Sequence, residues 1–218
     1  MPTSTHPLFA RVYARVRPAM DRQGAADHRR RLLAGLVGDV VEVGAGDGGN
    51  FTSYPSTVSS VLAVEPEPYL RARATEQARA AAVPIEVVDA SGDRLPVPDE
   101  SVDAAVLSLV LCSVRDPAAV LAEAFRIVRP GGSLRFYEHV VADGAGALRR
   151  VQRVVDATLW PRLLGGCHTG RDAAKSIVAA GFVVDEIHRF AFPPGRPSPA
   201  SPHILGRATR PATRKPAG

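Results

Sequence analysis

The stretch that decides the fold reads Val40-Val41-Glu42-Val43-Gly44-Ala45-Gly46-Asp47-Gly48-Gly49. Its first four residues form a short and largely apolar segment of the kind that makes a buried parallel strand. The small residues that follow allow a tight turn and let the backbone approach a ligand closely. The stretch therefore predicts the first strand of an open α/β sheet, with a nucleotide-like ligand at the carboxyl end of that strand.

Short apolar strands alternate with helices along the rest of the chain. We expect strands at residues 40–43, 61–64, 85–88, 104–109 and 134–138. This alternation is typical of a mostly parallel sheet with helices on both faces, which is the doubly wound α/β fold class. Residues 182–190 and 203–208 predict a closing pair of strands, because the connection between them contains too many prolines to be sheet.

The pattern divides the chain into three expected parts. Residues 1–36 carry apolar side chains at helical spacing and predict a helical cap, in which Pro18 interrupts a first helix before a second begins near His28. Residues 37–208 form the main domain. Residues 209–218 lack apolar periodicity and predict a disordered tail.

Composition limits the partners that we expect. The 218 residues carry a net charge of +5, but the basic residues are scattered along the chain. Aromatic residues make up only 6% of the sequence. Both features argue against a nucleic-acid partner. Cys112 and Cys167 lie far apart without C-x-x-C spacing, so we expect no metal site and no disulfide. The apolar runs are short, and we therefore expect a soluble, cytoplasmic protein without a membrane anchor. The oligomeric state stays open.

Gly44, Gly46 and Gly49 match the G-x-G-x-x-G pattern, which fits two kinds of cofactor. An NAD-dependent oxidoreductase and an S-adenosylmethionine-dependent enzyme both remain possible from the glycines alone. Glu42 favours the second, because dinucleotide folds usually keep an apolar residue at this position. Two further segments support it, Leu95-Pro96-Val97-Pro98-Asp99-Glu100-Ser101-Val102-Asp103 and Val128-Arg129-Pro130-Gly131-Gly132.

Together these segments resemble the class I S-adenosylmethionine-dependent methyltransferases. The resemblance implies a methyltransferase domain at residues 37–208, with a seven-stranded, Rossmann-like sheet whose last strand is antiparallel. It also implies S-adenosylmethionine as the cofactor, with S-adenosylhomocysteine as the product. Asp89, Ser91 or Asp93 could meet the adenine, and we favour residues 91–93. The expected cofactor-binding residues are Glu42, Gly44, Ala45, Gly46, Gly49, Asn50, Glu65, Pro66, Ser91, Gly92, Asp93, Ser108 and Leu109.

A narrower resemblance rests on segments that recur in order. They are Leu109-Val110-Leu111-Cys112-Ser113-Val114, Glu138-His139-Val140, Gly166-Cys167-His168 and Pro202-His203-Ile204. Over residues 40–208 the chain is similar to the methyltransferase-like 7 family, whose vertebrate members are alkyl-thiol S-methyltransferases. The resemblance implies a small thiol as the methyl acceptor. The vertebrate enzymes carry an N-terminal membrane anchor, whereas this chain has a polar helical segment there.

His139 is the expected catalytic residue. It follows the fifth strand at the sheet edge where open α/β folds bind ligands, and an imidazole can take a proton or stabilise a thiolate. Glu138 should face the other way by strand alternation and have a structural role. The expected substrate pocket comprises Tyr13, Cys112, His139, Trp160, His168 and His203.

Three alternatives to thiol methylation remain at this stage. The glycine loop and the Arg-Pro-Gly-Gly turn also fit an O- or C-methyltransferase that acts on a phenol or quinol. A module that binds S-adenosylmethionine without catalysis, and an NAD-dependent oxidoreductase, are alternatives of other classes.

Overall fold

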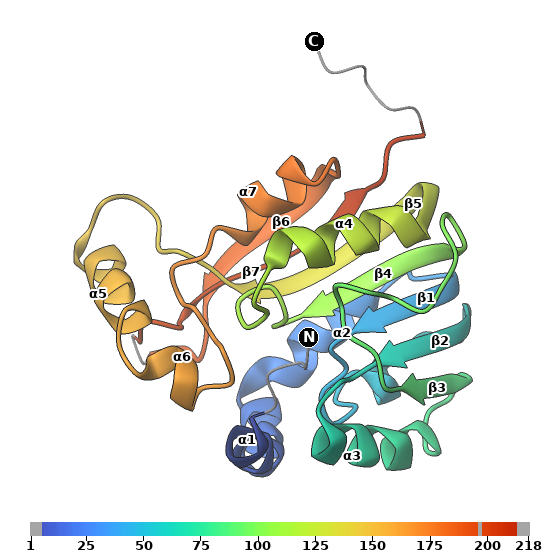
Figure 1. Ribbon diagram of the computed structural model, residues 1–218, viewed down its shortest axis with the longest axis horizontal. Coiled ribbons are helices and arrows are strands. Elements are labelled where there is room, and N and C mark those ends of the chain that lie inside the picture. The colour runs from blue at the N-terminus through green and yellow to red at the C-terminus, as the bar shows by residue number, and fades with distance from the viewer. Residues whose placement is uncertain (1–5, 196–197, 213–218) are drawn as a thin grey trace.

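The computed structural model describes residues 6–195 and 198–212. One seven-stranded sheet forms its centre, in the order β3-β2-β1-β4-β5-β7-β6 (Figure 1). Neighbouring strands pair in parallel from β3 through β5, whereas β7 is antiparallel to both β5 and β6. The expected fold class and the antiparallel last strand are therefore confirmed. The strands are β1 (Gly38–Val43), β2 (Val58–Val64), β3 (Ile85–Val88), β4 (Val102–Ser108), β5 (Val128–His139), β6 (Val183–Ala191) and β7 (Pro202–Thr209).

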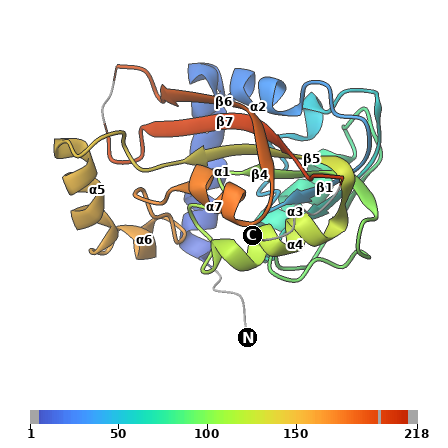
Figure 2. The ribbon, with the colours of Figure 1, turned by 90° about the horizontal axis from the view of Figure 1, so that it is seen from above.

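The helices cover both faces of the sheet (Figures 1 and 2). Alternate residues of β1 point to opposite faces, so Val41 and Val43 pack with α4 and α7, whereas Val40 packs with α2 and α3. This arrangement buries the apolar strands on both sides. The helices are α1 (Pro7–Met20), η1 (Asp21–Ala25), α2 (Ala26–Leu33), η2 (Phe51–Ser53), α3 (Pro68–Ala78), α4 (Pro117–Ile127), α5 (Ala147–Asp156), α6 (Trp160–Leu163) and α7 (Ala173–Ala179).

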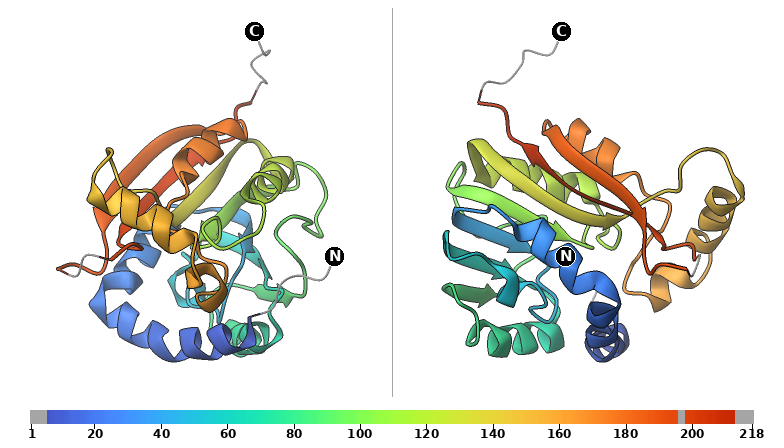
Figure 3. Two further views of the ribbon diagram at one scale, coloured as in Figure 1. Left: turned by 60° about the vertical axis from the view of Figure 1, so that its left-hand side comes forward. Right: turned by 180° about the vertical axis from the view of Figure 1, so that it is seen from behind.

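The carboxyl ends of the parallel strands point to one side of the molecule. Helix α1 and the short helices α5 and α6 lie on that side, away from the opposite ends of the strands (Figures 1 and 3). Gly165, just after α6, approaches Phe9 of α1 so closely that an added Cβ would come within 2.5 Å of its ring. The strand ends are thus bordered by two helical segments that touch each other.

The N-terminal helices differ from the expectation. Pro18 does not interrupt the first helix, because α1 continues through it to Met20. The bend falls instead at Gly24, whose φ of 120° is open to glycine and strained for other residues. Leu33 of α2 and Leu36 just after it are buried in the core beside β1, so α2 packs as part of the main domain. Only α1 has the position of a cap.

The C-terminal boundary also differs from the expectation. β7 continues to Thr209, and the guanidinium of Arg210 donates to the carbonyl oxygen of Phe125 at 2.8 Å. The ordered fold therefore extends past residue 208. The rest of the expected tail, residues 213–218, lies outside the described residues. Among the residues that the structure describes, no helix is both long and apolar enough to span a membrane.

Candidate active site

The glycine loop begins as β1 ends and is held against β2. The backbone N–H groups of Gly44 and Ala45 both donate to the carbonyl oxygen of Val64, at 2.8 and 3.0 Å. Gly44 has a φ of 70°, and an added Cβ would lie 2.8 Å from a methyl group of Val110. The loop after β4 therefore packs directly on the glycine loop, and a side chain at position 44 would separate them.

Glu42 is buried beneath this loop, with 1% of its surface exposed. Its carboxylate accepts hydrogen bonds from Asn50 Nδ2 at 2.8 Å and from the Tyr54 hydroxyl at 2.6 Å. Burial raises the pKa of Glu42 to about 7, although both hydrogen bonds oppose the rise. The carboxylate of Glu42 thus binds two side chains that follow the loop.

Asn50 Oδ1 is a buried acceptor without a hydrogen-bond partner among the described residues. An unmatched buried polar atom costs free energy unless a ligand or water satisfies it. The Asn50 side chain is held at the end of the glycine loop by its hydrogen bond to Glu42. The amide oxygen therefore fits the ammonium group at the amino-acid end of S-adenosylmethionine.

Glu65 joins the ends of β1 and β2. It is 6% exposed, and its carboxylate accepts from the backbone N–H groups of Gly46 at 2.8 Å and Glu67 at 2.9 Å. Burial raises the pKa of Glu65 to about 7. Pro66 follows directly at the start of the turn into α3. A carboxylate held here has the position from which doubly wound nucleotide-binding folds bind ribose hydroxyls.

The third expected cofactor segment is a turn beside the end of β1. Ser91 pairs with Arg94, and an added Cβ at Gly92 would lie 2.6 Å from Val43. Asp93 is exposed, and Asp89 forms an ion pair with Arg71 at 3.0 Å. The turn thus lies next to the end of β1, where the glycine loop begins, and Gly92 is its point of contact.

β4 ends one residue earlier than expected, at Ser108, because Leu109 has a φ of 60°. This left-handed conformation is uncommon for leucine and breaks the extended backbone. The Leu109 N–H donates to the carbonyl oxygen of Tyr137 at 2.7 Å, which fixes the turn. Strained backbone held in this way is common at ligand sites.

Helix α1 covers the glycine loop. Tyr13 lies 3.6 Å from the position of a Cβ at Gly46, and Arg17 Nε donates to the buried carboxylate of Asp47 at 2.7 Å. The structure therefore places Tyr13, expected in the substrate pocket, over the cofactor loop. Sequence reasoning missed Arg17, Asp47 and Tyr54, although Asp47 lies within the glycine stretch and was the available signal.

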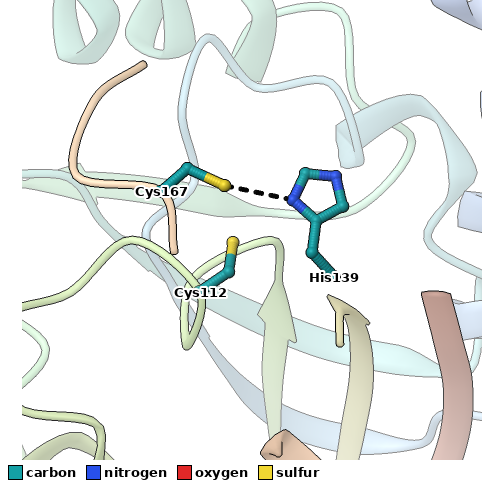
Figure 4. A group of neighbouring side chains, drawn as sticks. All are labelled: Cys112, His139 and Cys167. Atoms are coloured by element: carbon teal, nitrogen blue, oxygen red, sulfur yellow. Dashed lines mark hydrogen bonds between the residues drawn. The ribbon is translucent and has the colours of Figure 1, made fainter. Parts of the chain in front are cut away.

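Cys112, His139 and Cys167 come together at the ends of β4 and β5 and form what we call the sulfur cluster (Figure 4). His139 Nδ1 lies 3.3 Å from the sulfur of Cys167, and the three donor atoms lie within 4.8 Å of one another. Both cysteines are free thiols and buried, while His139 is half-buried. No spacing rule could find this cluster, because its members come from three separate segments.

Backbone contacts fix the segments that carry the cluster. Buried Glu138 accepts from the N–H groups of Val110 at 2.9 Å and Leu111 at 3.0 Å, and burial raises the pKa of Glu138 to about 7. The His168 N–H donates to the Cys112 carbonyl oxygen at 2.7 Å. The expected structural role of Glu138 is confirmed: it holds the loop that bears Cys112.

The cluster is electrostatically coupled. The hydrogen bond between the two sulfurs and burial raise the pKa of Cys112, and the same hydrogen bond lowers the pKa of Cys167. Burial opposes the charged form of His139, but the neighbouring Cys112 outweighs it and raises the pKa of the imidazole. Of the two thiols, Cys167 is therefore the one that ionises more readily.

The other expected pocket residues have different positions. His203 stacks edge-on against His139, with 4.5 Å between ring centroids, and burial lowers the pKa of His203 to about 3, which keeps it neutral. His168 follows Cys167 directly. Trp160 begins α6, and its indole N–H is buried without a partner in the described part of the chain. The structure thus brings His203 and His168 to the cluster and leaves Trp160 on the neighbouring helix.

A surface cavity of about 500 Å³ lies elsewhere, on α5 and α6. None of the strand-end residues lines it, so it does not coincide with the glycine loop or the sulfur cluster. We locate the site from the strand ends and their converging polar groups, as the doubly wound topology predicts. The lining residues of the cavity are Asp156, Ala157, Thr158, Leu159, Pro161 and Arg162.

Comparison with known proteins identifies the family. The family model described as "Methyltransferase domain" matches residues 41–136. The chain is 37% identical to mouse thiol S-methyltransferase TMT1B over 183 residues, covering 82% of this chain and 74% of the relative. It is 33% identical to human thiol S-methyltransferase TMT1A over 174 residues, covering 78% and 70%.

The fold is shared with solved structures of low sequence identity. The N-methyltransferase NodS from Bradyrhizobium japonicum WM9, in complex with S-adenosylhomocysteine, superposes with a TM-score of 0.64 at 17% identity. The match covers 87% of this chain and 88% of NodS. S-adenosylmethionine is thus the cofactor. The chain is a class I S-adenosylmethionine-dependent methyltransferase and belongs to the family that contains the thiol S-methyltransferases TMT1A and TMT1B.

Proposed function

We propose that this enzyme methylates the sulfur of a small-molecule thiol. The observation that carries the proposal is the sulfur cluster at the ends of β4 and β5, beside the loop that packs on the glycine loop. The mouse and human relatives are named thiol S-methyltransferases, which supports the same acceptor class. We also propose a cytoplasmic location, because a reducing compartment keeps the two cysteines free.

The cofactor side consists of the segments that follow β1, β2 and β3. Glu65 binds the ribose hydroxyls, while Asn50, fixed by Glu42, accepts from the ammonium group. The glycine loop and the adjoining Pro66 allow close backbone approach, and residues 91–93 meet the adenine. Ser108 and Leu109 border the methionine portion through their backbone atoms. When bound, S-adenosylmethionine supplies an electrophilic methyl group on a sulfonium centre.

Methyl transfer requires little of the acceptor side beyond holding the acceptor in position and favouring its thiolate form. A thiol has a reference pKa of about 8.5, so a useful fraction is ionised near neutral pH. His139 Nδ1 lies 3.3 Å from the Cys167 sulfur, and from this position the imidazole helps to stabilise the thiolate of the acceptor. Burial of Cys112 and Cys167 excludes water and strengthens these charge interactions. In this proposal Trp160, His168 and His203 border the same region, while Tyr13 covers the glycine loop.

The test is a panel of acceptors with matched carbon skeletons. Purified enzyme and S-adenosylmethionine are incubated with small alkyl and aryl thiols and, in parallel, with the corresponding alcohols and phenols. Mass spectrometry should detect methyl thioethers and equimolar S-adenosylhomocysteine only with the thiols. Turnover of a phenol or quinol without turnover of any thiol would contradict the proposal and assign an O- or C-methyltransferase instead.

A further inference from the structure

We propose that Cys112, His139 and Cys167 bind a zinc ion, with the fourth coordination position open to the acceptor thiol. The part of this inference that concerns the acceptor rests on the function proposed above, whereas the metal site rests on the cluster itself. Two thiols and an imidazole are donors that zinc prefers over magnesium or calcium, which prefer oxygen. The proposal reverses the sequence-based expectation that the chain has no metal site.

The size of the cluster fits one zinc ion. Two sulfurs at about 2.3 Å from a tetrahedral zinc stand about 3.8 Å apart, and a sulfur and an imidazole nitrogen stand about 3.6 Å apart. Here His139 Nδ1 lies 3.3 Å from the Cys167 sulfur, and the three donors lie within 4.8 Å of one another. Changes of at most about 1 Å in the distances between the donors would bring all three to one ion.

The geometry also accounts for all three donors. A disulfide would involve the two sulfurs but not the imidazole. A thiolate–imidazolium pair would involve the imidazole but only one of the two sulfurs. In Figure 4 the ring nitrogen and both sulfurs point toward a common centre. Metal coordination is the chemistry that uses each of them, with zinc bound to two thiolates and one neutral imidazole.

The protein holds the donors in place before any ion binds. Cys112 lies in the loop that Glu138 fixes, and Cys167 precedes His168, whose N–H donates to the Cys112 carbonyl oxygen at 2.7 Å. Gly166 approaches the same loop, since an added Cβ would lie 2.4 Å from the carbonyl oxygen of Ser113. A metal site requires ligands that are oriented by surrounding contacts, and these contacts supply that orientation.

The number of donors indicates a catalytic site more than a structural one. Within residues 6–195 and 198–212, no fourth histidine, cysteine or carboxylate joins the group. Structural zinc sites usually have four protein ligands, whereas catalytic sites have three and leave one position for water or substrate. Cys112 lies two residues after Val110, which packs on Gly44, so the group lies on the loop that contacts the glycine loop.

Because one coordination position is open, the metal can bind the acceptor sulfur during methyl transfer. The acceptor thiol loses its proton to solvent, and its sulfur binds zinc as a thiolate while Nδ1 of His139 remains a ligand. A lone pair of that sulfur then forms the new bond to the methyl carbon. The bond between the methyl group and the sulfonium breaks, and its electron pair stays on the departing sulfur. The neutral thioether is a weaker ligand and leaves the site.

Metal content tests the site directly. The protein, prepared without a polyhistidine tag and with added zinc, is desalted and measured by elemental analysis. We expect about one zinc per chain in the wild type and a loss of about tenfold or more in Cys112→Ser, Cys167→Ser and His139→Gln. His188→Gln, a change at an exposed histidine of β6, should keep the wild-type content. Wild type with negligible zinc, or serine variants that keep it, would overturn the proposal.

Cobalt tests the open position without any variant. Wild type loaded with Co²⁺ should show a thiolate-to-metal charge-transfer band that grows when a small thiol is added and does not respond to its methyl thioether. A charge-transfer band that does not change when the thiol is added would overturn the proposed binding of the acceptor to the metal. Thiol methylation by fully metal-free protein would overturn the catalytic zinc but keep the proposed function. Zinc and the spectral response without thiol methylation would instead refute the proposed function.

Discussion

The two halves of the active site are built on different principles. The cofactor side, around Glu42 and Glu65, is oxygen-rich, and its largest part, from Glu42 to Asn50, is a continuous run of sequence that ends a strand and begins a loop. The acceptor side, the sulfur cluster, joins side chains from three segments of the chain. Cofactor chemistry is thus encoded locally, whereas acceptor chemistry depends on the assembled fold.

The largest expected effect comes from the acceptor side alone. His139→Gln removes a group that can hold a proton or bind a metal, and kcat/KM for a thiol should fall about 10³-fold. Binding of S-adenosylhomocysteine, measured by calorimetry, should change less than about twofold because the variant leaves the glycine loop intact. His188→Gln serves as the control. Equal losses in both measurements would show that the two halves are not separable.

On the cofactor side, Glu42 should make the stability of the fold depend on pH. Glu42 has a pKa of about 7 in the folded protein, above the value near 4.5 of an exposed glutamate. A raised folded pKa contributes stability that is present below pH 4.5 and lost as the pH rises through 7. Glu42→Gln should therefore match the wild type near pH 4.5 and exceed its unfolding free energy by about 3 kcal/mol at pH 8.

Urea denaturation of the cofactor-free proteins at several pH values measures this difference. Glutamine can accept from Asn50 and donate to the Tyr54 oxygen, so the variant keeps both contacts of the carboxyl group. Parallel stability curves for the two proteins between pH 4.5 and 8 would show that Glu42 does not titrate near 7.

A smaller and more selective effect is expected at Glu65. Glu65→Gln keeps the size of the side chain but removes the charge that we assign to the ribose hydroxyls. The Kd of S-adenosylhomocysteine should rise about tenfold, while the KM of the thiol stays within about twofold. Glu76→Gln, at an exposed position of α3, is the control. A change in the KM of the thiol without a change in the Kd of S-adenosylhomocysteine would contradict the assignment of Glu65 to the cofactor side.

The smallest expected effect decides to which half Tyr13 belongs. The sequence suggested the substrate pocket, whereas the side chain packs over Gly46. Tyr13→Phe should weaken cofactor binding about threefold, the value of one modest hydrogen bond, and leave the thiol KM unchanged. The opposite pattern, a raised KM for the thiol with unchanged cofactor affinity, would show that Tyr13 belongs to the acceptor pocket.

The difference between the halves explains what could be predicted from the sequence. The strand–glycine pattern at residues 40–49 predicted β1, its loop and the sheet class, because local periodicity and small residues carry that information. Glu65 was found for the same reason. Asp116 and Pro117 likewise mark the start of α4, where the Asp116 carboxylate accepts from the Ala118 N–H at 3.0 Å.

Long-range geometry was not predictable in this way. Cys112 and Cys167 were read as unrelated, because spacing rules cover ligands that share one loop or helix. The bend of the N-terminal helices was assigned to Pro18, whereas the helix tolerates that proline and Gly24 supplies the unusual φ. Leu109 was assigned to a strand because its apolar side chain fits one, although tertiary contacts hold its backbone in the left-handed region.

Direct competition between sulfur and oxygen tests the central claim. The enzyme receives S-adenosylmethionine with a deuterium-labelled methyl group, together with equal amounts of a thiol and the alcohol or phenol of the same skeleton, and products are measured by mass spectrometry. We expect the label in the methyl thioether and not in the methyl ether. Label in the ether, with none in the thioether, would contradict it.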